Sequence, residues 1–216
     1  MSFVISPLFL LLVVANVLGV GMLVPQGARL AKSKSIAGVS PRWVGLGFGI
    51  NIGWLAYATL ADVPGLLPVS AGALVLYGWM LISLGKISRT AVVEGLLTSA
   101  LLLAALVLTG FVGGVAAVGV FGLGFLYTVQ FAPAAWESFT SSDLSGIAPV
   151  TWIMGLVEAA IWTVYGRSTG DLGLVVGGTG ASIMAIIVLV NLLRSQLRTD
   201  QQRLARRVGA LVRHGR

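Results

Sequence analysis

The sequence predicts an all-α membrane protein of seven transmembrane helices, in which a linker helix joins two parallel three-helix repeats (a 3+1+3 arrangement). Three observations predict this fold. The chain is too apolar for a water-facing surface, since 57% of its 216 residues are hydrophobic and only 10% are charged, against about 25% charged in soluble domains. Its apolar residues form long runs separated by short polar links. Part of the chain also recurs at a fixed offset, so we expect lipid around a duplicated bundle.

The spans follow from length and apolarity, because crossing the bilayer takes about 20 mostly apolar helical residues. Turn signals at Asp62–Gly65 and Lys86–Arg89 separate neighbouring segments. The boundary near Gly110–Gly114 is the least marked. No basic residue precedes the first apolar run, which is longer than the core of a signal peptide, so we expect it to be retained as a helix. The seven predicted spans are 5–24, 42–61, 66–85, 91–110, 112–131, 149–166 and 172–193.

The basic residues predict the orientation, because Lys and Arg gather in cytoplasmic loops. With the N-terminus outside, thirteen of the 14 Lys and Arg residues fall inside and only Arg167 falls outside. Seven arginines follow the last span from Arg194 onward, against one acid, Asp200. We expect this tail to form a basic amphipathic helix on the anionic inner leaflet. The prediction is a multi-pass protein of the plasma (inner) membrane with a cytoplasmic C-terminus.

An internal repeat with an offset of 108 residues sets the domain organisation. The offset contains four spans, an even number, so the two copies cross the membrane in the same direction. We expect a first triple-helix repeat at 1–90, a linker helix at 91–110, a second repeat at 111–195 and a basic tail at 196–216. Parallel repeats place a solute site between the copies. The identical pairs include Pro25/Pro133, Ser33/Ser141, Gly38/Gly146, Pro41/Pro149, Trp54/Trp162 and Tyr57/Tyr165.

Three polar side chains fall near the middle of the predicted bilayer. Glu158 lies nine residues after the proline that begins its span, or about 13.5 Å at helical rise, and Asn51 lies ten residues after its own, or about 15 Å. Asn16 reaches a similar depth in the first span. Trp54 and Trp162 share helix faces with Asn51 and Glu158. We therefore predict a substrate-binding pocket lined by these five residues.

Each of these residues also has a structural alternative. Asn16 and Asn51 would either hydrogen-bond the solute or hold helices together. The two tryptophans would either stack on the solute or pack in the core. Glu158 would bind a cationic group, carry a proton, or serve as a protonated structural residue, because burial favours the neutral carboxyl. It is the proton-coupling candidate of the chain.

The repeated segments resemble a known superfamily. Pro25-Gln26, the basic loop that follows and Gly38-Val39-Ser40-Pro41 look like the PQ-loop motif. The second copy keeps Pro133 but has Ala134 in place of glutamine. Residues 162–166 (Trp-Thr-Val-Tyr-Gly), followed by Asp171, resemble the matching stretch of SWEET sugar transporters. The resemblance to the PQ-loop/SWEET superfamily covers about residues 5–195.

This resemblance implies a central pocket, alternating access and four hinge prolines: Pro25, Pro41, Pro133 and Pro149. Proline can bend a helix because it removes a backbone hydrogen bond, but Pro41 and Pro149 also suit a plain helix start. The sequence departs from the sugar-transporter pattern at Val69–Ser70 and Gly177–Gly178, where the family carries a pocket asparagine. A sugar loses its main expected hydroxyl contact there.

Other function classes receive little support. The chain has no cysteine and one histidine, His214, near the C-terminus, and no phosphate loop or nucleophile–base pair, so we expect no enzyme activity, no metal and no cofactor. We predict a transporter of a small polar metabolite, a sugar or an amino acid, that is facilitative or proton-coupled. The alternative is a non-transporting PQ-loop protein that acts as a sorting receptor or scaffold. Expected partners are the small-molecule solute and membrane lipids; a homo-oligomer is allowed and no nucleic acid is expected.

Overall fold

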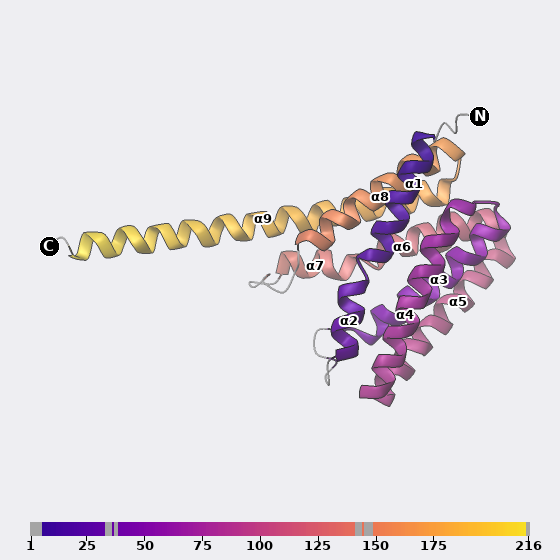
Figure 1. The fold of residues 1–216 in the computed structure, drawn as a ribbon, viewed down its shortest axis with the longest axis horizontal. Coiled ribbons are helices and arrows are strands. Elements are labelled where there is room, and N and C mark those ends of the chain that lie inside the picture. The colour runs from indigo at the N-terminus through magenta and orange to yellow at the C-terminus, as the bar shows by residue number, and fades with distance from the viewer. Residues whose placement is uncertain (1–5, 33–35, 37–38, 141–143, 145–148, 215–216) are drawn as a thin grey trace.

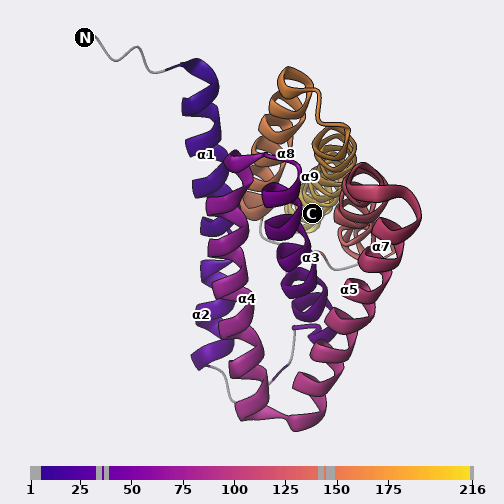
Figure 2. The same ribbon diagram turned by 90° about the vertical axis from the view of Figure 1, so that its right-hand side faces the viewer.

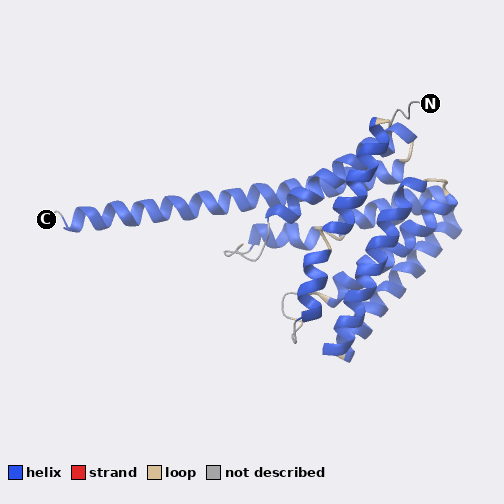
Figure 3. Cartoon of the chain, viewed as in Figure 1, coloured by secondary structure: helices blue, strands red, loops and turns tan. Residues whose placement is uncertain are grey.

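A computed structural model describes residues 6–32, 36, 39–140, 144 and 149–214, with side chains up to residue 197 except at 133, 134 and 137. The described residues form helices and no strands (Figure 3), which agrees with the predicted all-α class. The elements are α1 (Pro7–Gly21), α2 (Val24–Lys32), α3 (Pro41–Leu60), η1 (Pro64–Leu66), α4 (Leu67–Ile87), α5 (Arg89–Ala117), η2 (Val118–Gly124), α6 (Phe125–Val129), α7 (Ala132–Thr140), α8 (Pro149–Thr169) and α9 (Leu172–His214).

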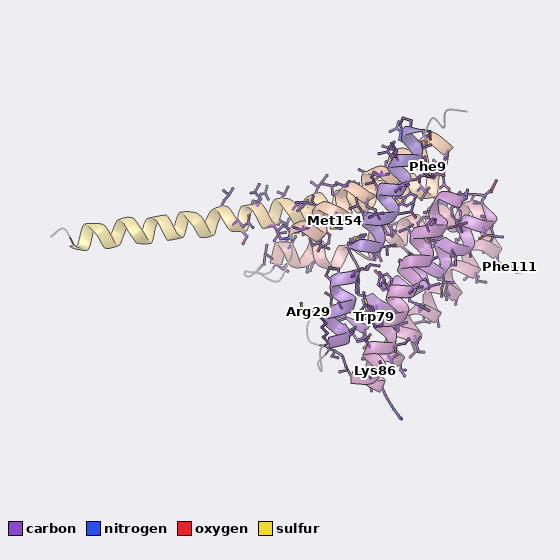
Figure 4. The ribbon with its side chains drawn as sticks, in the orientation of Figure 1. Phe9, Arg29, Trp79, Lys86, Phe111 and Met154 are labelled. Atoms are coloured by element: carbon purple, nitrogen blue, oxygen red, sulfur yellow. The ribbon has the colours of Figure 1, made fainter. Side chains whose placement is uncertain are left out.

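Five helical stretches in the described part are long and apolar enough to cross a membrane: Pro7–Lys32, Pro41–Leu60, Pro64–Ile87, Arg89–Val129 and Leu172–Leu197. Large apolar side chains such as Phe9, 56% exposed, and Phe111, 91% exposed, lie on the outside of the bundle (Figure 4). These features agree with a multi-pass membrane protein. The number is smaller than the seven predicted spans, because Arg89–Val129 covers two of them and α8 is not included.

The boundary between the fourth and fifth predicted spans lies at Gly114. Its backbone has φ 73° and ψ −174° inside α5, a conformation that glycine adopts far more readily than other residues. After this residue the chain turns, and η2 packs back against α5. The structure thus has a kink at the position where the sequence marks its span boundary least clearly.

A helix break recurs at the repeat offset. The short helices α2 (Val24–Lys32) and α7 (Ala132–Thr140) have bounds that differ by 108 residues at both ends. The hydrogen bonds at the two breaks also correspond: Leu23 N donates to Val20 O at 3.1 Å, and Phe131 N donates to Thr128 O at 3.2 Å. The helix break before α2 therefore has a counterpart before α7 at the offset of the sequence repeat.

The four prolines occupy helix starts. Pro25 and Pro133 are the second residues of α2 and α7, and Pro41 and Pro149 are the first residues of α3 and α8. In the first turn of a helix the missing proline N–H has no intrahelical partner to lose. Ser40 caps α3 by accepting a hydrogen bond from Trp43 N at 3.3 Å. A plain helix start is therefore enough to explain where the four prolines lie, and their role as hinges stays a prediction.

The helices pack in a reciprocal pattern. α4 packs against α1, α2 and α3, and α9 packs against η2, α6, α7 and α8; Figure 2 shows α4 between α2 and α3. Across the bundle α1 contacts α8 while η2 contacts α3. The first group of helices is α1 to α4, and the second group is η2 and α6 to α9. Figure 1 shows these two groups converging near the N-terminus and diverging toward the other end. α9 continues as one helix beyond the bundle to His214, and the predicted amphipathic faces of this tail lie outside the described side chains.

Candidate functional site

A cavity of about 50 Å³ lies between the two groups of helices. It is small compared with ordinary ligand pockets, which measure roughly 300–1,000 Å³. Helices α3, α4, α6, α8 and α9 and the η1 turn contribute its walls. The lining residues are Asn51, Trp54, Leu66, Val69, Ser70, Tyr127, Glu158, Trp162, Leu174, Gly177 and Gly178.

Most of the lining obeys the repeat. Eight of the eleven residues form four pairs separated by 108 positions: Trp54/Trp162, Leu66/Leu174, Val69/Gly177 and Ser70/Gly178. A cavity on the axis between two equivalent halves produces such pairing, because each half presents the same positions to the centre. The repeat therefore surrounds the cavity.

The remaining three lining residues break the symmetry. Asn51, Tyr127 and Glu158 line the cavity, whereas their counterparts at the 108-residue offset are Ala159, Gly19 and Ile50. The carboxyl, phenol and amide groups of the cavity thus all occupy positions at which the two copies differ. The paired residues shape the space, and the unpaired residues supply most of its polar chemistry.

Glu158 is the central polar group. Its side chain is 3% exposed, and each carboxyl oxygen accepts one hydrogen bond. Trp162 Nε1 donates to Oε1 at 2.9 Å, and Tyr127 OH donates to Oε2 at 3.3 Å. Gly19 of α1 closes the space beside the carboxyl, since a Cβ at this position would lie 2.7 Å from Glu158 Oε1. Three helices thereby hold one carboxyl group in a fixed place.

The structure brings together four of the five predicted pocket residues. Asn51, Trp54, Glu158 and Trp162 line the cavity, and the Asn51 amide also donates to Gly47 O at 2.7 Å. The fifth residue lies elsewhere: the Asn16 amide donates to Leu12 O at 2.7 Å and to Gly65 O at 3.1 Å. Asn16 therefore ties α1 to the turn between α3 and α4.

Sequence reasoning missed two polar residues of the cavity. Tyr127 was not singled out because its counterpart in the first copy is a glycine. Ser70 was noted only for lacking the asparagine of the SWEET pattern. Its side chain is 1% exposed, and its Oγ has no hydrogen-bond partner among the described residues. The repeat offset was the signal that could have found Ser70. Ser70 and Gly178 are 108 residues apart, and both line the cavity.

A hydrogen bond joins the two groups of helices at the end near the N-terminus. Tyr57 OH of α3 donates to Asp171 Oδ2 at 2.9 Å. The other carboxyl oxygen of Asp171 accepts from Leu174 N at 2.9 Å and caps α9. The duplicated aromatic pairs have similar geometry. The ring centroids of Trp54 and Tyr57 lie 5.7 Å apart with an interplanar angle of 79°, and those of Trp162 and Tyr165 lie 6.0 Å apart with an angle of 82°.

The opposite end carries basic side chains and separate polar contacts. Arg29 and Lys86 lie toward this end (Figure 4). Arg42 Nε donates to the exposed Glu94 Oε1 at 2.5 Å and joins α3 to α5. In the second group Asn191 Nδ2 of α9 donates to Ser138 Oγ of α7 at 2.9 Å. Neither of these contacts therefore joins the two groups of helices.

Comparison of the chain with protein-family models and with curated protein sequences found no match. Among the described residues no group of three or more His, Cys, Asp or Glu is placed to hold a metal ion. The cavity and its polar residues are thus the basis for a functional conclusion, and the PQ-loop/SWEET resemblance stays a prediction.

Proposed function

We propose that this chain is a membrane transporter of a small polar solute that works by alternating access. The strongest support is the lining of the cavity, in which four pairs of residues from equivalent positions surround three unpaired polar groups. Transporters built from repeats bind their solute at the repeat interface, near the middle of the bilayer. A buried acid at this depth is functional more often than structural.

The proposed architecture has seven spans in a 3+1+3 arrangement. The stretch Arg89–Val129 contributes two spans, since the backbone turns at Gly114 and η2 packs back on α5. We count α8 as a further span, because its 21 residues reach across about 30 Å. The mean hydropathy of α8 is reduced by Glu158, which we assign to the solute site. The first part of α5 is then the linker helix between the two repeats.

The geometry suggests how the two ends of the cavity open in turn. At the end near the N-terminus the Tyr57–Asp171 hydrogen bond joins the two groups, while the groups diverge toward the other end (Figure 1). A cavity of about 50 Å³ is too small for a sugar or a large amino acid without rearrangement. The matched breaks before α2 and α7 give each repeat one place at which to bend.

Reconstitution tests this proposal. Purified protein in liposomes is assayed for uptake of labelled sugars, amino acids and small amines, with and without a pH gradient. We expect uptake above that of empty liposomes, and Glu158→Gln abolishes any dependence on the gradient. Glu94→Gln is the matched control, because Glu94 lies on an exposed face away from the cavity.

Two outcomes would count against the proposal. Uptake equal to that of empty liposomes across the panel, with the protein folded, would exclude transport of these solutes. Gradient-driven uptake that survives unchanged in both Glu158→Gln and Glu94→Gln would remove Glu158 from the coupling step.

A further inference from the structure

Resting on the proposed function, we infer that the cavity selects a small protonated amine that carries no carboxylate, such as an alkylammonium ion. The reasoning starts from charge. Glu158 is the only ionisable acid or base that lines the cavity besides the phenol of Tyr127, and none of the lining residues is basic. A buried carboxylate without a positive partner is unfavourable in a membrane interior, so a cationic solute can replace the proton that otherwise neutralises this group.

The hydrogen-bonding capacity of the cavity points to a donor. Trp162 Nε1–H and Tyr127 O–H are both directed to Glu158, and the Asn51 amide donates to its own helix. Acceptor sites remain on the Glu158 carboxylate, the Asn51 carbonyl oxygen and Ser70 Oγ. An ammonium group has N–H donors and no acceptor, so it complements this set.

Ser70 is an independent indication of a ligand. Its Oγ is buried, lines the cavity and has no partner in the described part of the chain. An unpaired buried hydroxyl is unfavourable, and an ammonium N–H would give its oxygen a hydrogen-bond donor. Gly19 lets α1 pack closely against both α4 and α8, because a Cβ there would lie 2.7 Å from both Val69 Cγ2 and Glu158 Oε1.

The aromatic walls suit a cation. Trp54, Tyr127 and Trp162 line the cavity, and the rings of Trp54 and Tyr127 meet edge to face at 6.5 Å. Indole and phenol faces attract ammonium groups, most strongly where water is excluded. Neutral sugars gain less from this arrangement, because few free donors and acceptors are left to match several hydroxyl groups.

The same geometry disfavours an amino acid. Its ammonium group would meet Glu158, but its carboxylate would find no basic side chain in the lining and would repel the Glu158 charge at close range. Size agrees with this selection: the cavity of about 50 Å³ accommodates about three or four water-sized groups. Ethylammonium, with three non-hydrogen atoms, fits without rearrangement.

The test uses ethylammonium, alanine and glucose as probes of the purified full chain in detergent, at constant ionic strength set with NaCl. Alanine is ethylammonium with a carboxylate added, so the pair isolates the effect of that group. Binding raises the melting temperature according to ligand concentration and affinity. We expect ethylammonium to raise it in a saturable manner, and alanine and glucose to leave it unchanged.

Variants connect the shift to the cavity. Glu158→Gln weakens ethylammonium binding about 10- to 100-fold, and Ser70→Ala weakens it about 3- to 10-fold, as expected for losing a charged and a neutral hydrogen-bond partner. Ser182→Ala is the matched control with less than about a twofold effect: its Oγ is also buried and unpaired within the described residues, but Ser182 does not line the cavity. If Glu158→Gln fails to fold, Ser70→Ala against Ser182→Ala still decides.

The outcomes separate this inference from the proposed function. A shift with glucose or alanine and none with ethylammonium would overturn the amine selection and leave a transporter standing. An ethylammonium shift unaffected by Ser70→Ala and Glu158→Gln would place the binding outside the cavity and overturn the inference as well. No shift with any probe, together with no uptake in liposomes, would remove both.

Discussion

Tyr57→Phe should open the end of the cavity that faces the N-terminal side. The change removes the hydroxyl that donates to Asp171 Oδ2 at 2.9 Å and leaves the ring and its contact with Trp54. A hydrogen bond to a charged group contributes about 1.5–3 kcal/mol. Asp171 is partly exposed, so we expect about 1 kcal/mol after solvent screening. That weakening favours the opened state about fivefold.

The absence of cysteine from the chain provides the assay. Ser70→Cys places a single thiol in the cavity, and its rate of modification by a small membrane-impermeant methanethiosulfonate reports access. Adding Tyr57→Phe should raise this rate about fivefold from the side of the N-terminus, in line with the population shift. Tyr165→Phe is the control, because this symmetry-related hydroxyl has no hydrogen bond to Asp171 among the described residues. Equal rates in the two variants would show that the Tyr57–Asp171 contact does not hold this end closed.

Two further predictions concern packing. Gly45→Ala should lower the melting temperature of the purified protein, because its Cβ would lie 2.0 Å from Gly95 O and overpacking costs about 1–3 kcal/mol. Gly78→Ala is the control and should not lower it, because its Cβ meets nothing closer than 3.5 Å. An equal loss in both variants would refute the close contact of α3 with α5. Asn191→Ala removes a buried hydrogen bond to α7 worth about 1 kcal/mol, so amide hydrogen exchange in α7 should accelerate about fivefold. Ser83→Ala is the control: the described Ser83 hydroxyl donates to its own helix, so exchange in α2 should stay unchanged. Unaltered exchange in α7 would show that Asn191 does not hold α7 against α9.

Helix positions were largely predictable because apolar length and proline punctuation decide them. The predicted span 42–61 corresponds to α3, Pro41–Leu60, since a serine cap and a proline mark its start. The joined stretch Arg89–Val129 was less predictable. Glycine at position 114 allows a reversal without any polar loop, so hydropathy does not mark the turn. The tail was predicted to be helical, but as a separate surface helix after the last span; α9 instead continues as one helix to His214, because a change from apolar to basic composition does not by itself end a helix.

The position of the site along the helices was predictable, but the direction of each side chain was not. Counting residues from each proline placed Glu158 and Asn51 at similar heights, and both line the cavity together with the duplicated tryptophans. Depth alone does not fix rotation about the helix axis, and Asn16 turns toward Gly65 rather than the cavity. Tyr127 could not be found from the repeat, because its counterpart is a glycine; only the packing of α6 against its neighbours brings it to Glu158.

The central claim is that one cavity between the two repeats opens to either side of the membrane in turn. The most direct measurement is modification of Ser70→Cys in sealed right-side-out and inside-out vesicles by the same impermeant reagent. The proposed mechanism predicts labelling from both sides, with ethylammonium slowing the reaction in each orientation. Labelling from one side only, or from neither in folded protein, would contradict it.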